Sequence, residues 1–226
     1  MHDIGIRDEI IERVIKRRKR LHIFETIQAS RSALVVIDMQ GTFCAPGSPA
    51  EVPASRGICD NINRLAAGMR TAGGRVIWCT HANNQIGAGS DWKIFFDNIV
   101  SGELRERTIE ALDPGAPGQQ IWRDMDVQPQ DICLFKNRYS ALIAGSSQLE
   151  RILRSLEIDT LLIAGTKTNI CCEATARDGM MLDFKCIMVS DCTAALSDDE
   201  HRSALENIIQ QFGDVYTSEE IMARLC

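Results

Sequence analysis

The sequence predicts an α/β domain in which helices cover both faces of a doubly wound, parallel sheet. Six short apolar runs with the composition of strands alternate with longer segments that carry apolar residues at helical spacing. This alternation is typical of a parallel sheet whose strands are joined by helices. The chain has 226 residues, of which 45% are hydrophobic and 25% are charged, and this suits one domain with a sizeable core.

A helical arm is expected ahead of the main domain, over residues 1–31. Residues 7–21 are amphipathic, with an apolar stripe on one side and a basic run over residues 16–20. The basic run either contacts an anionic partner or forms a solvated face. The stripe needs a cover, for which a second subunit is one candidate. The residues of the stripe are Ile10, Ile11, Val14 and Ile15.

The first two strands of the main domain flank a well-marked helix. Residues 33–38 are apolar up to Asp38, as in a central strand covered on both faces, and a loop rich in Pro and Gly follows. Residues 58–72 carry apolar residues at helical spacing and end before two glycines, which favours a helix with a glycine stop. Residues 75–80 are the second expected strand.

The middle of the chain is less regular. Gly87 and Gly89 indicate a loop, and a short helix is expected over residues 92–99. Residues 102–119 contain several Pro and Gly and are expected to be an insertion with loops rather than a domain linker. The third strand is expected over residues 131–135.

The last part of the chain alternates helix and strand. Ser197, followed three residues later by Glu200, gives a capping box at the start of one of the helices. The expected helices are residues 148–156, 173–182, 197–212 and a last one from 218, and the expected strands are 160–164, 185–189 and 214–217.

Composition and charge argue against several classes of function. The net charge of −6 makes nucleic-acid binding a poor candidate, because such proteins carry a basic face. No run approaches the ~20 apolar residues of a membrane span, and no secretory signal is visible. The nine cysteines are an odd number without a C-x-x-C pair, which favours reduced thiols. We therefore expect a cytoplasmic protein whose partner is a small molecule.

Reactive side chains follow three of the expected strands, at the ends where ligands bind in doubly wound sheets. Asp38 follows the first strand, Lys136 the third and Cys171 the fourth. An acid, a base and a thiol at one rim suit covalent hydrolysis of an amide-like bond. The alternative is that the two charged residues stand at the strand ends only because that edge of the sheet is exposed to solvent, and that Cys171 is a buried core thiol.

Cys171 lies where the strand over residues 160–164 passes through a polar turn into a helix. The first N–H groups of a helix lack internal partners and carry partial positive charge. A thiol at this position is expected to have a lowered pKa. The same short stretch could then supply both a nucleophile and backbone donors for an oxyanion.

A family resemblance rests on three stretches in this order: VVIDMQ with FCAPG, then FKNRYSAL, then GTKTNICCEATARDG. Over roughly residues 32–217, the sequence resembles the isochorismatase-like cysteine hydrolase superfamily. In character it is nearest to the branch of ureidoacrylate, biuret and N-carbamoylsarcosine amidohydrolases, in which an arm also precedes the first strand. The resemblance implies that residues 32–226 form a hydrolase domain with three α/β/α layers and a six-stranded parallel sheet in the order 3-2-1-4-5-6.

The resemblance also implies roles for individual residues. Asp38, Lys136 and Cys171 match the family's Asp–Lys–Cys triad, and a cis peptide bond is implied between Thr166 and Lys167. The backbone N–H groups of Lys167 and Cys171 would form the oxyanion hole. The implied reaction cleaves a C–N bond of a small ureido, carbamoyl or primary amide substrate through a thioester, with release of ammonia or an amine. Because the implied sheet order separates the strands of Lys136 and Asp38 by one strand, the lysine must reach back.

Several residues near these positions are candidate substrate contacts. Amides and hydroxyls could bind the donor and acceptor edge of a ureido group, and rings could wall the pocket. For each, packing, helix capping or a structural hydrogen bond is the alternative. The candidates are Gln40, Phe43, His81, Trp92, Tyr139, Ser140 and Asn169.

No metal and no cofactor are expected. Nicotinamidases of the superfamily hold a metal ion with the help of histidines, whereas this chain has only four His. The resemblance implies a homodimer or homotetramer. Two other functions stay open: a non-catalytic binding or assembly protein on the same fold, and a thiol redox protein that uses Cys171 and Cys172.

Overall fold

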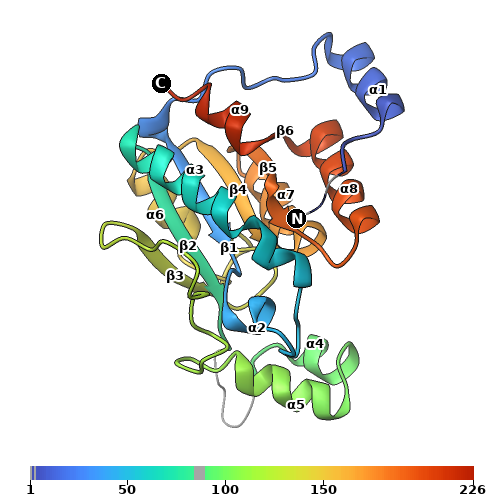
Figure 1. Cartoon of the computed structure of the whole chain (residues 1–226), viewed down its shortest axis with the longest axis vertical. Coiled ribbons are helices and arrows are strands. Elements are labelled where there is room, and N and C mark those ends of the chain that lie inside the picture. The colour runs from blue at the N-terminus through green and yellow to red at the C-terminus, as the bar shows by residue number, and fades with distance from the viewer. Residues whose placement is uncertain (1, 3, 84–89) are drawn as a thin grey trace.

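The computed structural model describes residues 2, 4–83 and 90–226 of the chain. The strands are β1 (Ser32–Ile37), β2 (Arg75–His81), β3 (Ile132–Lys136), β4 (Thr160–Thr166), β5 (Lys185–Ala194) and β6 (Asp214–Tyr216). Within the described residues they form one sheet in the order β3-β2-β1-β4-β5-β6, and each neighbouring pair is parallel (Figure 1). This confirms the predicted fold class and strand order.

β1 lies at the centre of the sheet and separates two cores. It pairs with β2 on one side and with β4 on the other, and all of its residues are buried. Successive side chains of a strand point to opposite faces. Ala33, Val35 and Ile37 accordingly belong to one apolar cluster, and Leu34 and Val36 belong to the other.

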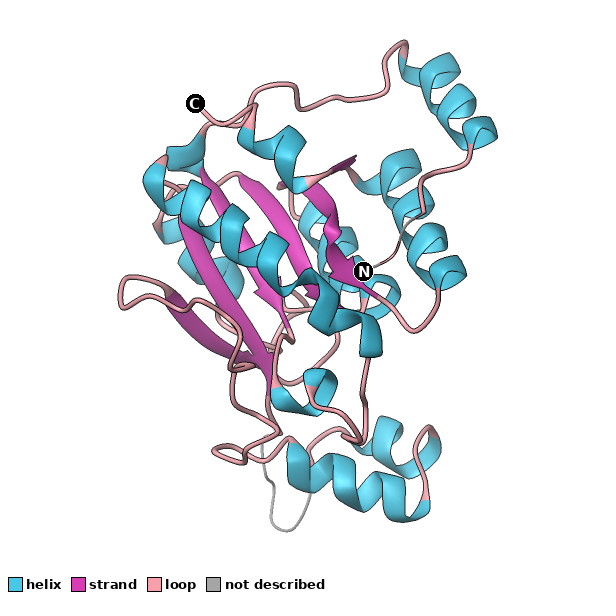
Figure 2. Ribbon diagram, in the orientation of Figure 1, coloured by secondary structure: helices cyan, strands magenta, loops and turns pink. Residues whose placement is uncertain are grey.

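Helices cover both faces of the sheet (Figure 2). The helices are α1 (Asp8–Arg18), α2 (Gly41–Cys44), α3 (Cys59–Thr71), α4 (Lys93–Asn98), α5 (Gly102–Ala111), α6 (Leu149–Ser155), α7 (Glu173–Met181), α8 (Asp198–Asn207) and α9 (Ser218–Met222). α3 and α9 close one core, through residues such as Ile62 and Ile221. α6, α7 and α8 close the other, through Leu153, Ala176 and Leu205.

The N-terminal arm packs on its own chain. α1 buries Ile10 and Val14 in the same cluster as Leu205 of α8. After α1, two backbone N–H groups of the arm donate to the buried carboxylate of Asp214, at 2.7 and 3.2 Å. The two buried stripe residues are therefore covered within one chain, without a second subunit.

The structure adds a helix within residues 102–119, for which the sequence predicts an insertion with loops. α5 occupies the first part of this range, and Thr108 is its one residue described as buried. A helix with so little buried surface shows almost no apolar periodicity, so the pattern does not reveal it. The loop predicted at Gly87 and Gly89 lies outside the described residues.

β5 is longer than the predicted strand over residues 185–189. A register shift between β4 and β5 lets Thr193 and Ala194 pair with Gly165 and Thr166. This extension supports the end of β4, where the chain leaves the sheet for the thiol-bearing turn. The predicted capping box at the start of α8 is confirmed. In the described part of the chain, no helix combines the length and apolarity needed to cross a membrane.

Candidate active site

Three reactive side chains gather at the carboxyl ends of the strands. Asp38 directly follows β1, Lys136 is the last residue of β3, and Cys171 follows β4. The Lys136 Nζ atom lies 2.8 Å from Asp38 Oδ2, and both side chains are fully buried. Cys171 is buried as well, with 4% of its surface exposed. The sequence prediction that these residues share one rim agrees with this placement.

Lys136 reaches Asp38 across the end of the intervening strand. In the sheet register Lys136 is paired with His81 of β2, and β2 in turn pairs with β1. The ammonium also donates to the carbonyl of Arg138 at 3.0 Å. The lysine side chain therefore reaches past β2 to β1, and its ammonium group contacts two oxygen atoms, the Asp38 Oδ2 and the Arg138 carbonyl oxygen.

Asp38 leaves β1 in a left-handed backbone conformation, with φ of +54°. Its N–H donates to the carbonyl of Cys79 at 2.8 Å, and its own carbonyl accepts the N–H of Gln40 at 2.9 Å. Asp is among the few residues that adopt this conformation at low cost. The turn ends the strand abruptly and leaves the carboxylate within ion-pair distance of Lys136.

The environment shifts the pKa values of both members of the ion pair upward. Burial raises the pKa of Asp38 above its usual range, against the opposing effects of Lys136 and of the Cys171 thiol. Burial by itself lowers the pKa of Lys136, but the Asp38 carboxylate and neighbouring thiols outweigh it and the net shift is upward. The lysine thus stays protonated, while the aspartate is better able to take up a proton near neutral pH.

Burial raises the pKa of the Cys171 thiol, the Asp38 carboxylate raises it further, and Lys136 opposes both. The sequence prediction of a lowered pKa at the helix start is wrong. Loss of hydration and a nearby negative charge dominate over the helix N-terminus here. Cys171 therefore rests as a thiol, and its proton must leave when the sulfur attacks.

We expect Cys171 to react slowly with iodoacetamide at neutral pH. Because the thiolate is the nucleophile and the pKa is raised, the rate constant should rise about tenfold per pH unit up to at least about pH 9. Peptide mass spectrometry after timed alkylation measures this rate, with the exposed Cys226 as an internal reference for the reagent. A rate that is already constant with pH in the neutral range would contradict the resting thiol.

Cys171 lies in a π-helical turn, Thr168–Cys172, that runs directly into α7. The Lys167 carbonyl accepts the N–H groups of Ile170 and Cys172, which flank Cys171, both at 3.2 Å. The peptide bond between Thr166 and Lys167, just before the turn, is cis. Widened helical turns of this kind are frequent at functional sites.

Side-chain hydroxyls tie this segment to its neighbours on both sides. Before the turn, Thr166 Oγ1 donates to the Ala194 carbonyl of β5 at 3.2 Å. After it, Thr175 Oγ1 donates to the Cys171 carbonyl at 2.7 Å and accepts the N–H of Ala141 at 3.1 Å. The backbone around the thiol is therefore held by contacts with two distant segments of the chain.

A cavity of about 100 Å³ adjoins the thiol. At roughly 10–15 Å³ for each water-sized group, this is space for a small molecule. Six of the residues singled out from the sequence line it. They are Phe43, His81, Trp92, Tyr139, Lys167 and Cys171.

Gln40, Ser140 and Asn169 are not among the residues that line this cavity. Gln40 Nε2 donates to the His81 carbonyl at 3.0 Å and Oε1 accepts the His81 N–H at 2.7 Å, so the amide braces the end of β2. Ser140 Oγ accepts the N–H of Leu142 at 3.0 Å. The side-chain carbonyl of Asn169 is buried and has no hydrogen-bond partner among the described residues.

Much of the remaining wall comes from residues that the sequence analysis does not single out. Most of them belong to α4, α5 and the residue after α5, which lie beyond the carboxyl ends of the central strands (Figure 1). Two consecutive aromatic residues in α4 were the available signal. The residues missed are Ala50, Phe95, Phe96, Thr108, Leu112 and Ile170.

Trp92 is the centre of an aromatic cluster in the wall. Phe95 stacks against it at 4.9 Å between ring centroids, and Tyr139 meets it edge-on at 4.7 Å. The guanidinium of Arg138 lies 5.3 Å from the Trp92 ring centroid. Mutual packing therefore fixes the positions of the rings in this part of the wall.

His81 lines the cavity as a neutral ring. Burial lowers its pKa well below the usual value, and the positive charges of Lys136 and Arg138 act in the same direction. Among the described residues, no three His, Cys, Asp or Glu side chains lie close enough together to hold a metal ion.

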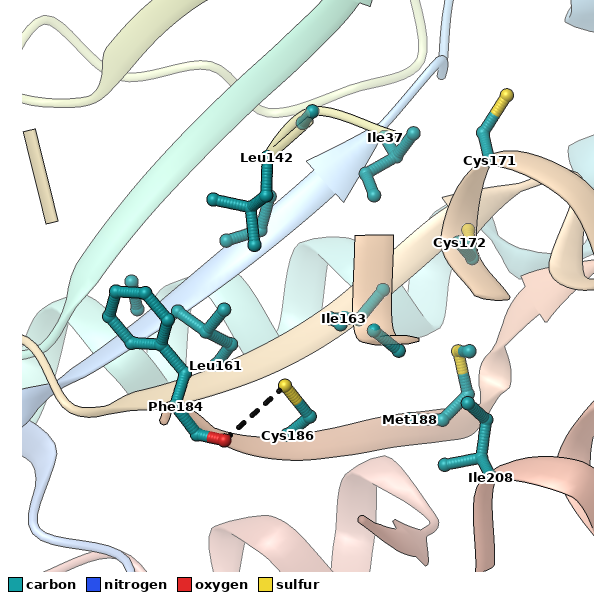
Figure 3. Close-up of a cluster of buried hydrophobic side chains, with 14 of the residues drawn as sticks. Ile37, Leu142, Leu161, Ile163, Cys171, Cys172, Phe184, Cys186, Met188 and Ile208 are labelled. Atoms are coloured by element: carbon teal, nitrogen blue, oxygen red, sulfur yellow. Dashed lines mark hydrogen bonds between the residues drawn. The ribbon is translucent and has the colours of Figure 1, made fainter. Parts of the chain in front are cut away.

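Cys172 belongs to the core. It is fully buried, and its Sγ donates to the Ala164 carbonyl at 3.7 Å. Figure 3 shows Cys171 at the edge of a buried cluster, with Cys172 nearer to Ile163 and Met188. Burial raises the pKa of Cys172 well above its usual value, and the neighbouring Cys171 adds to the shift.

Comparison with known proteins gives consistent matches over most of the chain. The Isochorismatase domain matches residues 32–220. Ureidoacrylate amidohydrolase RutB of Klebsiella variicola is 32% identical over 200 residues, which cover 83% of this chain and 84% of that protein. A cysteine hydrolase from Pseudomonas syringae superposes with a TM-score of 0.78 at 28% identity, covering 88% of this chain and 94% of that one. N-carbamoylsarcosine amidase from Thermoplasma acidophilum shares the fold, with a TM-score of 0.67 at 22% identity over 84% of this chain and 97% of that one.

Proposed function

Because the chain belongs to the isochorismatase family, we propose that it is a cysteine amidohydrolase that cleaves a C–N bond of a small ureido, carbamoyl or primary amide substrate. The observation that carries this proposal is the buried Lys136–Asp38 ion pair at 2.8 Å, whose charges both shift the pKa of the Cys171 thiol. A buried ion pair adds little net stability, because desolvation offsets its Coulomb energy. Catalysis is the better reason for its presence beside a thiol and a cavity.

In the first half of the proposed reaction, Asp38 takes the proton of Cys171 while the sulfur forms a bond to the carbonyl carbon. The carbonyl π electrons move to oxygen, and the backbone N–H groups of Lys167 and Cys171 hold the resulting oxyanion. Each such donor lowers a barrier by about 3 kcal/mol in comparable sites. Lys136 stays protonated throughout and keeps the carboxylate in place.

In the second half, the tetrahedral intermediate collapses and the C–N bond breaks. Asp38 returns its proton to the departing nitrogen, which leaves as ammonia or an amine, and the acyl group stays on Cys171 as a thioester. Asp38 then removes a proton from a water molecule that attacks the thioester carbon, the C–S bond breaks, and Asp38 returns the proton to the departing sulfur, which restores the Cys171 thiol and releases the acid. The raised pKa of Asp38 suits both steps, because an acid–base catalyst works best with a pKa near the operating pH.

The structure offers no specific support for a redox role of Cys171 and Cys172. Both thiols are buried, and burial raises both pKa values. Thiol–disulfide exchange proceeds through a thiolate, and the raised pKa values of both cysteines disfavour that form. No observation in the described residues favours a purely structural or assembly role over the hydrolase.

An ammonia-release assay tests the proposal with a panel that contains ureidoacrylate, N-carbamoylsarcosine, biuret and simple primary amides. We expect turnover of at least one member and a loss of at least about 10³-fold in kcat/KM for Cys171→Ser, since removal of a nucleophile costs this much or more in other hydrolases. Cys172→Ala is the matched control and should keep most of the activity, because Cys172 packs in the core. Equal turnover by wild type and Cys171→Ser would contradict the proposal.

A further inference from the structure

We infer that His201 is a positioning residue for the turn that carries Cys171, and that His2 holds His201 in place for this task. The inference rests on the proposed function, because it concerns the donors that would hold the oxyanion. The two histidines would then support catalysis although they neither line the cavity nor belong to the Lys136–Asp38 ion pair.

The first observation is a buried hydrogen bond between α8 and the thiol-bearing turn. Thr168 Oγ1 lies 2.9 Å from His201 Nδ1, and both residues are almost completely buried. Thr168 directly follows Lys167 and stands three residues before Cys171. This hydrogen bond therefore links α8 to the side chain of Thr168, a residue that lies in the sequence between the two residues whose N–H groups are proposed as oxyanion donors.

The second observation is that the His2 ring packs against His201. The His2 ring stacks on the His201 ring with 4.4 Å between centroids and 20° between planes. His2 Nε2 accepts the N–H of Ala195 at 3.0 Å, so the proton lies on Nδ1, which meets Asp198 Oδ1 at 2.6 Å. Both nitrogen atoms of His2 are thus bound to the segment that leads into α8, and the ring cannot turn freely.

The charge state of His201 fits a positioning role. Burial lowers the pKa of His201 to about 4, so His201 is neutral at physiological pH. In a neutral imidazole, Nδ1 either donates or accepts, and the Thr168 hydroxyl can take the matching role. A group that stays neutral also leaves the electrostatics of the ion pair and thiol undisturbed.

Oxyanion donors contribute only when they are fixed before the reaction, and small displacements are costly. A shift of about 1 Å in a positioned group can reduce a rate by about 10²-fold. The Thr168–His201 bond restrains the turn from a separate helix. Without it, the turn would keep its thiol but lose part of the alignment of its N–H groups.

The test compares variants that break the bond with variants that keep it. His201→Leu and Thr168→Val should lower kcat by about 10- to 100-fold with KM changed less than about threefold. His201→Asn, whose amide reaches the place of Nδ1, and Thr168→Ser, which keeps the hydroxyl, should stay within about fivefold of wild type. The substrate is the panel member with the highest kcat/KM, and thermal unfolding checks that each variant is folded.

Alkylation by iodoacetamide separates positioning of the donors from general damage. Alkylation consumes the thiol but builds no oxyanion, so His201→Leu and Thr168→Val should alkylate at Cys171 within about threefold of the wild-type rate. The double variant should lose no more than either single variant, because both changes break one bond. Unchanged kcat in both single variants overturns the inference, as does a loss in alkylation equal to the loss in hydrolysis.

His22 provides a matched control for His2. His22 also belongs to the arm, stacks on the Tyr216 ring at 4.1 Å and meets a carboxylate, Asp214, at 3.0 Å, so its ring contact and its hydrogen bond both go to β6. His2→Ala should lower kcat by about two- to tenfold, and His22→Ala should leave it unchanged apart from any loss of stability. Equal effects of the two changes on kcat would overturn the assignment of His2.

Failure of the inference and failure of the proposed function look different. If wild type hydrolyses a substrate, Cys171→Ser does not, and His201→Leu matches wild type, the amidohydrolase stands and the positioning role is wrong. If wild type hydrolyses no member of the panel, the proposed function is contradicted, and the positioning role is contradicted with it.

Discussion

Replacing Lys136 with methionine should abolish hydrolysis and lower the free energy of unfolding by about 3–5 kcal/mol, because it leaves the buried Asp38 carboxylate without its cation. Urea unfolding and the ammonia-release assay measure the two effects. The stability loss should shrink as the pH falls. Without the ammonium, the pKa of Asp38 in the folded protein rises further above its unfolded value, so the folded state regains stability as the pH falls below that pKa.

The double variant Lys136→Met with Asp38→Asn is the control for this interpretation. It removes both charges, so no uncompensated ion remains in the interior. We expect it to regain most of the lost stability while staying inactive, since Asn cannot accept the thiol proton. A double variant as unstable as Lys136→Met would show that lost packing of the lysine stem, and not an unpaired charge, causes the instability.

Gly165→Ala should prevent folding or lower the free energy of unfolding by more than about 4 kcal/mol. A Cβ atom at Gly165 would lie 1.9 Å from the carbonyl oxygen of Ile37, at a φ of +108° that side chains rarely adopt. The Ile37 atoms that the Cβ would meet belong to the backbone of the paired strand β1, so no rotamer change relieves the overlap. Soluble yield, circular dichroism and urea unfolding measure the effect.

Gly68→Ala is the matched glycine control. Gly68 lies inside α3, and an added Cβ would make an ordinary contact of 3.5 Å with the Met222 side chain. This change should leave stability unchanged or raise it by up to about 1 kcal/mol, since Ala is the better helix residue. If Gly165→Ala is as stable as Gly68→Ala, the close approach of β1 and β4 is not the constraint described above.

The residues at the strand ends could be predicted because local pattern and topology act together there. Asp38, Lys136 and Cys171 each follow an apolar run, and parallel strands bring their carboxyl ends to one edge. The alternation of β1 between two cores follows from the same logic, since a strand buried on both faces has no polar side. These features depend on short stretches of sequence and on few spatial rules.

The features that escaped prediction depend on contacts between distant segments. The raised pKa of Cys171 follows from burial under other parts of the chain, which no motif reports. The short helix at α4 is expected, but α5, which lines the cavity beside it, shows no clear apolar period because Thr108 is its one residue described as buried. The contact between Thr168 and His201 joins residues 33 apart in the sequence, and neither residue stands out on its own.

Trapping the acyl-enzyme tests the covalent role of Cys171 most directly. Tryptic cleavage after Lys167 and Arg177 isolates peptide 168–177, in which Cys171 is the only thiol in a Cys172→Ala background. Acid quenching during turnover, followed by mass spectrometry, should find the substrate's acyl group on this peptide, and the adduct should vanish when the substrate is exhausted. Steady turnover with this peptide unmodified, or with the acyl group on another residue, would contradict nucleophilic attack by Cys171.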